Sequence, residues 1–177
     1  MASNVQRYNT VAVVLHWVTA VVMIYMLFWG EGLIKSRGGE AATNPMLHVS
    51  LGILILVLAV TRLVWRLINP PPPDLPMPAW QRWGAHALHW AVYALMILLP
   101  LSGMAALDRS IAGKHPEFAS LTFFGTFPIP HFSLSWFGGM HDGLHVVAIL
   151  LLILHVLAAL KHQFIDKDRI LSRMSPG

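Results

Sequence analysis

The stretch from Met140 to Phe164, MHDGLHVVAILLLILHVLAALKHQF, decides the fold because it combines a lipid-like apolar run with four histidines. No residue between Gly143 and Leu160 carries a charged side chain. A helix needs about 20 mostly apolar residues to cross a bilayer, so this stretch predicts a membrane-spanning helix. The presence of four imidazoles in such a helix requires an explanation, because polar side chains inside a membrane are costly and are usually functional.

The composition extends this prediction to the whole chain. Of its 177 residues, 56% are hydrophobic and 11% are charged, and the mean hydropathy is +0.61. A soluble domain averages about 25% charged residues. The absence of cysteine excludes disulfides and cofactors attached or ligated through cysteine. Basic residues gather at the ends of apolar runs, which argues against a nucleic-acid partner.

Three further apolar runs complete an all-α fold, an integral membrane four-helix bundle formed by residues 1–177 as a single membrane domain. Helices satisfy their own backbone hydrogen bonds in lipid, which makes four helices the natural interpretation. Arg62 and Arg66 near the end of the second run have side chains long enough to snorkel to the headgroups. The predicted spans are approximately residues 10–30, 46–68, 82–107 and 140–163.

The distribution of basic residues predicts the orientation. With four spans both termini lie on one side, and that side has eight Arg and Lys residues against four on the other. By the positive-inside rule both termini are cytoplasmic, in a bacterial cytoplasmic (inner) membrane. The eight are Arg7, Arg62, Arg66, Arg82, Lys161, Lys167, Arg169 and Arg173, and the four are Lys35, Arg37, Arg109 and Lys114.

The histidines sort into two depths. Fourteen positions separate His141 from His155, which corresponds to about 21 Å of helix rise and nearly the same helix face. His48 shares the periplasmic depth with His141 or His145. The cytoplasmic depth holds His16 with His155, His86 or His89.

Two opposed imidazoles at one depth are the ligand set of a six-coordinate haem b, and facing helices of a bundle are where such cofactors bind. A single membrane histidine is more often explained by a hydrogen bond to a neighbouring helix. Four at matched depths favour two haems about 20 Å apart, which would pass electrons across the bilayer. A zinc site or a proton relay is less favoured, because no HExxH motif or cysteine pair occurs and no acidic residue lies in the uncharged cores.

These segments resemble the bacterial cytochrome b561 family, whose members are small four-helix dihaem proteins. The matching pieces are VVLHWVTAVVM, MLHVSLGILILVLAVTRLVWRL, AHALHWAVYALMILLPLSG and the final histidine-rich stretch. The resemblance implies two non-covalent, bis-histidine haems b: His16 and His155 ligate the cytoplasmic iron, and His48 and His141 the periplasmic iron. It leaves His145 as an extra residue, with His89 lining the cytoplasmic haem pocket.

The family includes a superoxide:ubiquinone oxidoreductase, so the resemblance implies electron transfer from periplasmic superoxide, or another periplasmic donor, to ubiquinone. Basic residues in the periplasmic connections would favour an anion, but four acidic residues nearly neutralise them (Glu31, Glu40, Asp108 and Glu117). The alternatives are an electron-relay subunit for a partner dehydrogenase or hydrogenase, and a non-redox membrane transporter or assembly factor.

A quinone site is expected at the cytoplasmic end. His162 projects from the ligand face about 10 Å beyond His155, where its imidazole can hydrogen-bond a quinone carbonyl and deliver a proton. Trp80 and Arg82 open the third span on the same side and complete the predicted pocket. Interfacial anchoring is an equally good explanation of Lys161 and His162.

Replacing His48 or His141 with alanine is expected to remove one haem equivalent per chain and to leave the other. The same change at His145 is expected to leave both. Pyridine haemochrome assays of the purified variants measure this, and retention of two haems after loss of His48 or His141 would contradict the ligand assignment.

Overall fold

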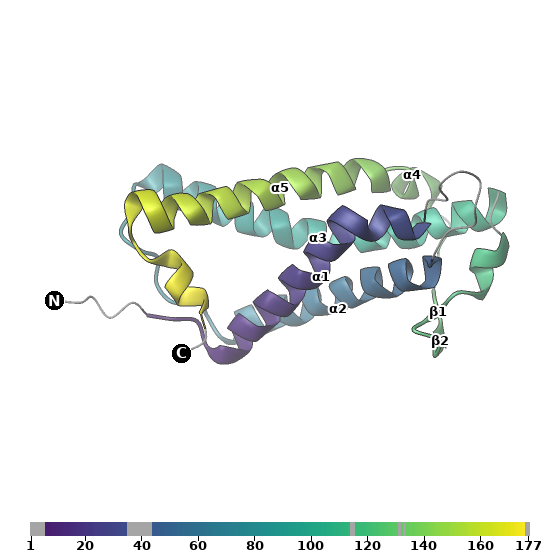
Figure 1. Cartoon of the computed structure of the whole chain (residues 1–177), viewed down its shortest axis with the longest axis horizontal. Helices are drawn as coiled ribbons and strands as arrows, with labels where there is room; N and C mark the ends of the chain where they lie inside the picture. The colour runs from purple at the N-terminus through teal and green to yellow at the C-terminus, as the bar shows by residue number, and fades with distance from the viewer. Residues whose placement is uncertain (1–5, 35–43, 114–115, 131, 133, 176–177) are drawn as a thin grey trace.

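Four long helices form the protein, and both chain termini lie at the same end of the bundle (Figure 1). The computed structural model describes residues 6–34, 44–113, 116–130, 132 and 134–175, and the side chains of residues 108–117 are not described. The end that holds the termini is called the terminal end, and the opposite end, which carries a small β-hairpin, is called the hairpin end. The elements are α1 (Thr10–Ile34), α2 (Pro45–Ile68), α3 (Ala79–Gly113), η1 (Pro116–Ser120), β1 (Thr122–Phe123), β2 (Phe127–Pro128), α4 (Ser135–Gly138), α5 (His141–Lys161), η2 (His162–Asp166) and η3 (Ile170–Met174).

Local sequence signals set the helix ends. The side chain of Asn9 accepts a hydrogen bond from the backbone of Ala12 at 2.9 Å, and Asn44 caps α2 in the same way, followed by Pro45 in the first turn. Asparagine at the cap and proline in the first turn are favoured choices because both suit the unpaired N–H groups there. After Ile68 the prolines at 70–73 have no N–H to donate, so the chain crosses to α3 without a helix.

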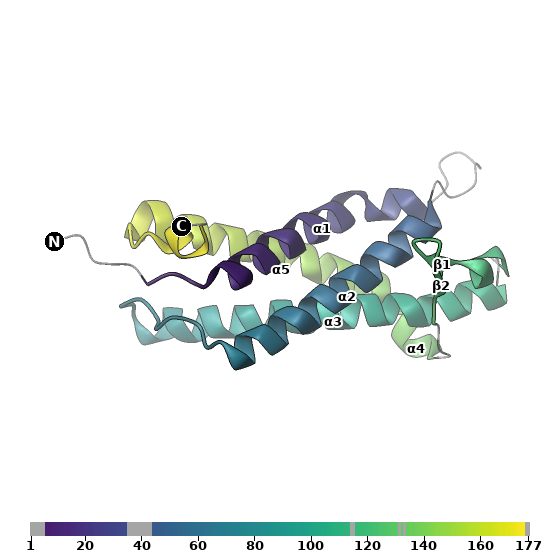
Figure 2. The ribbon, with the colours of Figure 1, turned by 90° about the horizontal axis from the view of Figure 1, so that it is seen from below.

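The interior and the exterior of the bundle are both apolar. Helix α1 packs on α2, α2 on α3 and α3 on α5, and α1 also touches α5 (Figures 1 and 2). Met23, Leu27, Ala59 and Met96 belong to the buried core, whereas Val21 and Leu150 on the outside are 66% and 60% exposed. Helices that are hydrophobic all round belong in a membrane. All four long helices are long and apolar enough to cross one, which confirms the predicted fold class.

At the hairpin end, two contacts fix the connection that leads into α5. The backbone N–H of Phe124 donates to the Ser50 hydroxyl at 3.0 Å and ties the hairpin to α2. Helix α4 lies against α3 so closely that a Cβ at Gly138 would come within 2.6 Å of the Ala106 nitrogen. Only glycine fits there without a shift of backbone, and this contact sets where α5 begins.

At the terminal end, the C-terminal segment folds back onto the N-terminal segment. Arg173 is 7% exposed, and its guanidinium donates to the carbonyls of Gln6 (3.0 Å) and Pro73 (2.8 Å). The Trp17 indole donates to the Met174 carbonyl at 2.7 Å. These bonds join the two termini to the proline-rich connection and hold η2 and η3 at the end of the bundle.

Candidate functional site

The hairpin end brings together two of the predicted histidines. His48 comes from the first turn of α2 and His141 is the first residue of α5, and their ring centres are 6.4 Å apart. Two imidazoles that ligate one metal ion through nitrogen bonds of about 2 Å hold their ring centres roughly 6 Å apart. The spacing therefore suits a metal ion held between the two rings, and it also lies within the range of an edge-to-face ring contact.

Backbone carbonyls of neighbouring helices hold both rings. Nδ1 of His48 lies 2.8 Å from the Gly30 carbonyl, and Nδ1 of His141 lies 3.1 Å from the Leu99 carbonyl and 3.0 Å from the Ser102 hydroxyl. A carbonyl only accepts, so each Nδ1 carries the hydrogen and each neutral ring presents an unprotonated Nε2. This is the tautomer that ligates a metal through Nε2.

Two glycines make room for these rings. A Cβ at Gly30 would lie 3.4 Å from Nδ1 of His48, and one at Gly103 would lie 3.0 Å from Cε1 of His141. Beside the rings is a cavity of about 160 Å³ with a mostly apolar lining that includes Met23, Met26, Met104 and Gly103. Sequence reasoning missed both glycines, although their position in a helix at the depth of a histidine is a usable signal.

The terminal end brings together three histidines. His155 of α5 lies with its ring centre 6.3 Å from that of His16 on α1 and 5.7 Å from that of His89 on α3. The predicted pair, His16 and His155, thus has almost the same spacing as the pair at the hairpin end. His89 reaches the same site, as expected for a residue of the pocket.

Arg62 points into the bundle at this site instead of snorkelling outward. Its Nη2 lies 3.1 Å from Nδ1 of His16, and its guanidinium lies over the Tyr93 ring at 5.4 Å. Arginine has no acceptor, so Nδ1 of His16 accepts and Nε2 of the neutral ring carries the hydrogen. Among the residues that the structure describes, no carboxylate forms an ion pair with Arg62.

The other predicted residues fall into three groups. Nε2 of His145 donates to the Leu27 carbonyl (2.9 Å) and joins α5 to α1, and His86 pairs with Asp74 at 3.0 Å on the surface. His162 is buried at the end of α5, while Trp80 and Arg82 are exposed at the start of α3, and no described contact joins them to His162. Lys35, Arg37, Glu40 and Lys114 lie outside the described residues, as do the side chains of Asp108, Arg109 and Glu117.

Four membrane-capable helices with facing histidines at both ends define a membrane protein built to hold cofactors between its helices. Residues 7–177 match the family model described as prokaryotic cytochrome b561. The chain is 33% identical to cytochrome b561 homolog 2 of Escherichia coli (strain K12), over 96% of this chain and 91% of that protein. It is 34% identical to the probable superoxide oxidase CybB of Yersinia pestis, over 97% of both chains.

The chain belongs to the prokaryotic cytochrome b561 family, and it is a membrane electron-transfer protein. Family membership implies haem b as the cofactor. The donor set fits that group at the hairpin end, because two facing imidazoles present unprotonated Nε2 atoms beside an apolar cavity.

Replacing Gly103 with leucine is expected to remove most of one haem equivalent, because the new side chain would occupy the place of the His141 ring. The same substitution at Gly143, where a Cβ would meet nothing within 4 Å, is the matched control and should leave the haem content unchanged. Haem-to-protein ratios of the two purified variants measure the difference. Equal haem contents would show that the Gly103 contact does not matter for the site.

Proposed function

We propose that the protein binds two haems b, one at each end of the bundle, and transfers electrons between them. The observation that carries this proposal is the repeated geometry of two histidine pairs. His48 faces His141 at 6.4 Å and His16 faces His155 at 6.3 Å, and each pair joins α5 to a different helix. Haem iron with two histidine ligands supplies one-electron transfer and leaves no open position for substrate.

In this proposal the chain's own residues fix the ligands before the cofactor arrives. The Gly30 and Leu99 carbonyls hold the two Nδ1–H groups at the hairpin end and strengthen the basicity of each ring. The cavity of about 160 Å³ is smaller than the 300–1,000 Å³ of a typical ligand pocket, so binding requires side chains to move. Met23, Met26 and Met104 in the lining have the flexible side chains suited to that movement.

Arg62 has a separate role at the terminal end. A guanidinium inside the bundle that forms no ion pair with a described carboxylate is a charge without a counter-ion, and the carboxylates of haem b would be its natural partners. If Arg62 turned to such a carboxylate, it would release Nδ1 of His16. That ring could then hold its hydrogen on Nδ1 and would present Nε2 as a ligand, in the tautomer that the pair at the hairpin end already has.

The proposed reaction is oxidation of superoxide coupled to reduction of ubiquinone. Two superoxide anions become two molecules of O₂ and give up two electrons, and one ubiquinone takes these electrons with two protons to become ubiquinol. The relative named as a probable superoxide oxidase, at 34% identity over nearly the whole of both chains, supports this activity. In the bacterial inner membrane the terminal end would face the cytoplasm and the hairpin end the periplasm, as the positive-inside rule predicts.

His162 is the proposed quinone contact, at the terminal end beyond His155. The residue is only 8% exposed, which suits a ligand site better than a surface anchor. The next residue, Gln163, has a side-chain oxygen that is buried without a described partner, and such an acceptor calls for a donor. Trp80 and Arg82 are proposed at the outer rim of the same site.

Stopped-flow mixing tests the proposed reaction. Haem-loaded protein mixed with superoxide is expected to show reduced haem bands, and subsequent ubiquinone is expected to reoxidise them. Replacing His162 with glutamine should slow the reoxidation and leave the haem content and the first step unchanged. Haems that superoxide does not reduce, but that an added protein donor does, would instead favour an electron-relay subunit.

Replacing Arg62 with methionine is expected to make the reduction potential of one haem more negative, because a nearby cation disfavours the more positive oxidised iron. The other haem should keep its potential. Arg7→Met, which removes an exposed basic side chain at the terminal end, is the control. Potentiometric titration of the visible bands measures both haems, and unchanged potentials in Arg62→Met would place this residue away from the cofactor.

A further inference from the structure

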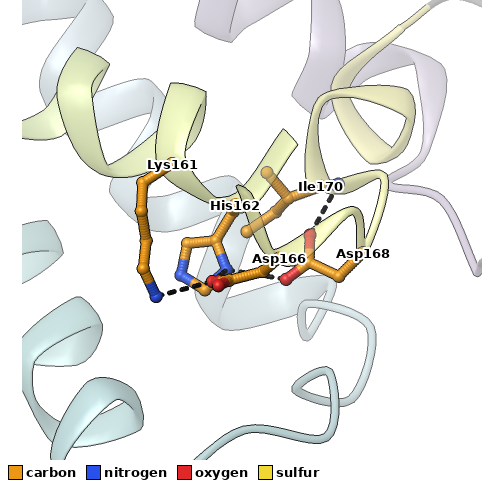
Figure 3. Close-up of polar contacts among 5 residues, drawn as sticks. All are labelled: Lys161, His162, Asp166, Asp168 and Ile170. Atoms are coloured by element: carbon orange, nitrogen blue, oxygen red, sulfur yellow. Dashed lines mark hydrogen bonds and ion pairs between the residues drawn. The ribbon is translucent and has the colours of Figure 1, made fainter. Parts of the chain in front are cut away.

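The last turn of α5 and the segment after it form a compact cluster of ionisable side chains (Figure 3). Nδ1 of His162 lies 2.6 Å from Oδ2 of Asp168 and 3.2 Å from Oδ2 of Asp166. The Lys161 ammonium lies 2.6 Å from the same Asp166 oxygen. Lys161 therefore engages Asp166, and Asp168 makes the shorter contact with His162.

The backbone holds Asp168 in this position. Oδ1 of its carboxylate accepts the Ile170 N–H at 3.1 Å, and its own N–H donates to the His162 carbonyl at 3.2 Å. The two residues beside it, Lys167 and Arg169, have φ values of +57° and +58°, a left-handed conformation that is uncommon for residues other than glycine. The chain thus turns sharply on both sides of Asp168, and the turn directs the carboxylate back at the imidazole.

The second ring nitrogen of His162, Nε2, is available to a ligand. In Figure 3 Nε2 points away from Asp168. Within the described part of the chain Nε2 has no hydrogen-bond partner, and it is not among the buried unpaired atoms. His162 is therefore a largely buried residue, 8% exposed, in which a carboxylate fixes Nδ1 and Nε2 stays accessible to a ligand.

We propose that Asp168 is a positioning residue for proton delivery by His162, an inference that rests on the proposed quinone site. The carboxylate fixes the hydrogen on Nδ1, orients the ring and stabilises the imidazolium, as the aspartate of a catalytic triad does for its histidine. The Nε2–H bond of the imidazolium breaks, and the proton goes to an oxygen of the quinone as electrons arrive from the haem. His162 is left neutral with its hydrogen on Nδ1, and it takes a new proton from cytoplasmic water.

A metal ion is the other chemistry that one histidine and two aspartates can support, because their ligand atoms lie within 4.8 Å of one another. The contact from Lys161 disfavours it, since an ammonium already neutralises Asp166 and would repel a cation. When His162 is protonated, Lys161 and His162 carry two positive charges beside the two carboxylates of Asp166 and Asp168. The cluster is then neutral without a metal ion. The arrangement therefore favours proton transfer.

The Asp168→Asn variant tests the inference through its kinetics. It is expected to lower the kcat of quinol formation by at least about tenfold, which is less than the full contribution of a positioned general acid. The KM for quinone should stay within about twofold of the wild-type value. The solvent deuterium isotope effect on haem reoxidation should rise, because proton transfer becomes slower. Haem content and haem reduction by superoxide should stay as in the wild type.

Two comparisons make the result specific. Asp74→Asn removes the carboxylate from another histidine–aspartate pair on the same side, His86 and Asp74 at 3.0 Å, and should change nothing. In a His162→Gln background, Asp168→Asn should have no further effect, because Asp168 acts through that ring. A merely structural Asp168 would give additive losses, or losses of haem content, and either result would overturn the inference.

The remaining outcomes separate this inference from the function on which it rests. Slow quinol formation in His162→Gln with normal rates in Asp168→Asn would overturn the role of Asp168 alone. Normal rates in both variants would move the quinone site elsewhere, and a wild type that reduces no quinone would overturn the function and the inference together. Tight binding of one Zn²⁺ per chain, lost in Asp168→Asn, would establish a metal site in place of the proton relay.

Discussion

A polar group inside a membrane needs a partner, and the structure of this protein depends on how its histidines meet that need. At the hairpin end the partner of each Nδ1–H is a backbone carbonyl from another helix, Gly30 for His48 and Leu99 for His141. These bonds fix the direction in which each ring faces. They also leave both Nε2 atoms free of these hydrogen bonds, on two histidines that line a mostly apolar cavity.

The histidines at the two ends of the bundle have different hydrogen-bond partners. At the terminal end the partner of His16 is the Arg62 guanidinium, itself a charge without a counter-ion among the described residues. The pair at the hairpin end is ready to ligate, whereas the pair at the terminal end must first exchange hydrogen-bond partners. If each end binds a haem, as proposed, this difference is a physical reason for the two haems to differ in affinity and in potential.

The sequence was sufficient to predict the fold class and the family. Long uncharged runs and four histidines at matched depths predicted a four-helix membrane bundle, and the comparisons confirm the family. The haem count, the ligand pairs and the orientation of the termini stay predictions. Gly30, Gly103 and Arg62 were not recognised as part of the site, because helical periodicity gives the depth of a residue but not its neighbours on other helices. Snorkelling of Arg62 was a reasonable expectation from the sequence, yet the ring of Tyr93 and the imidazole of His16 draw it inward.

Asp168 shows a second limit of the sequence. Nothing in the run of residues from His162 to Asp168 indicates that the chain turns back, since two left-handed residues that are not glycine carry no reliable sequence signal. The contact between Asp168 and His162 comes from the backbone conformation alone. A histidine that the sequence suggested only as a possible anchor or quinone contact thereby gains a defined orientation.

The central claim is that each end of the bundle binds one haem between two histidines. The most direct measurement combines the haem-to-chain ratio of the purified protein with its electron paramagnetic resonance spectrum in the oxidised state. Two haem equivalents per chain, both low-spin as two strong axial nitrogens require, are the expected result. A single equivalent, or a high-spin signal from iron with an open position, would contradict the account.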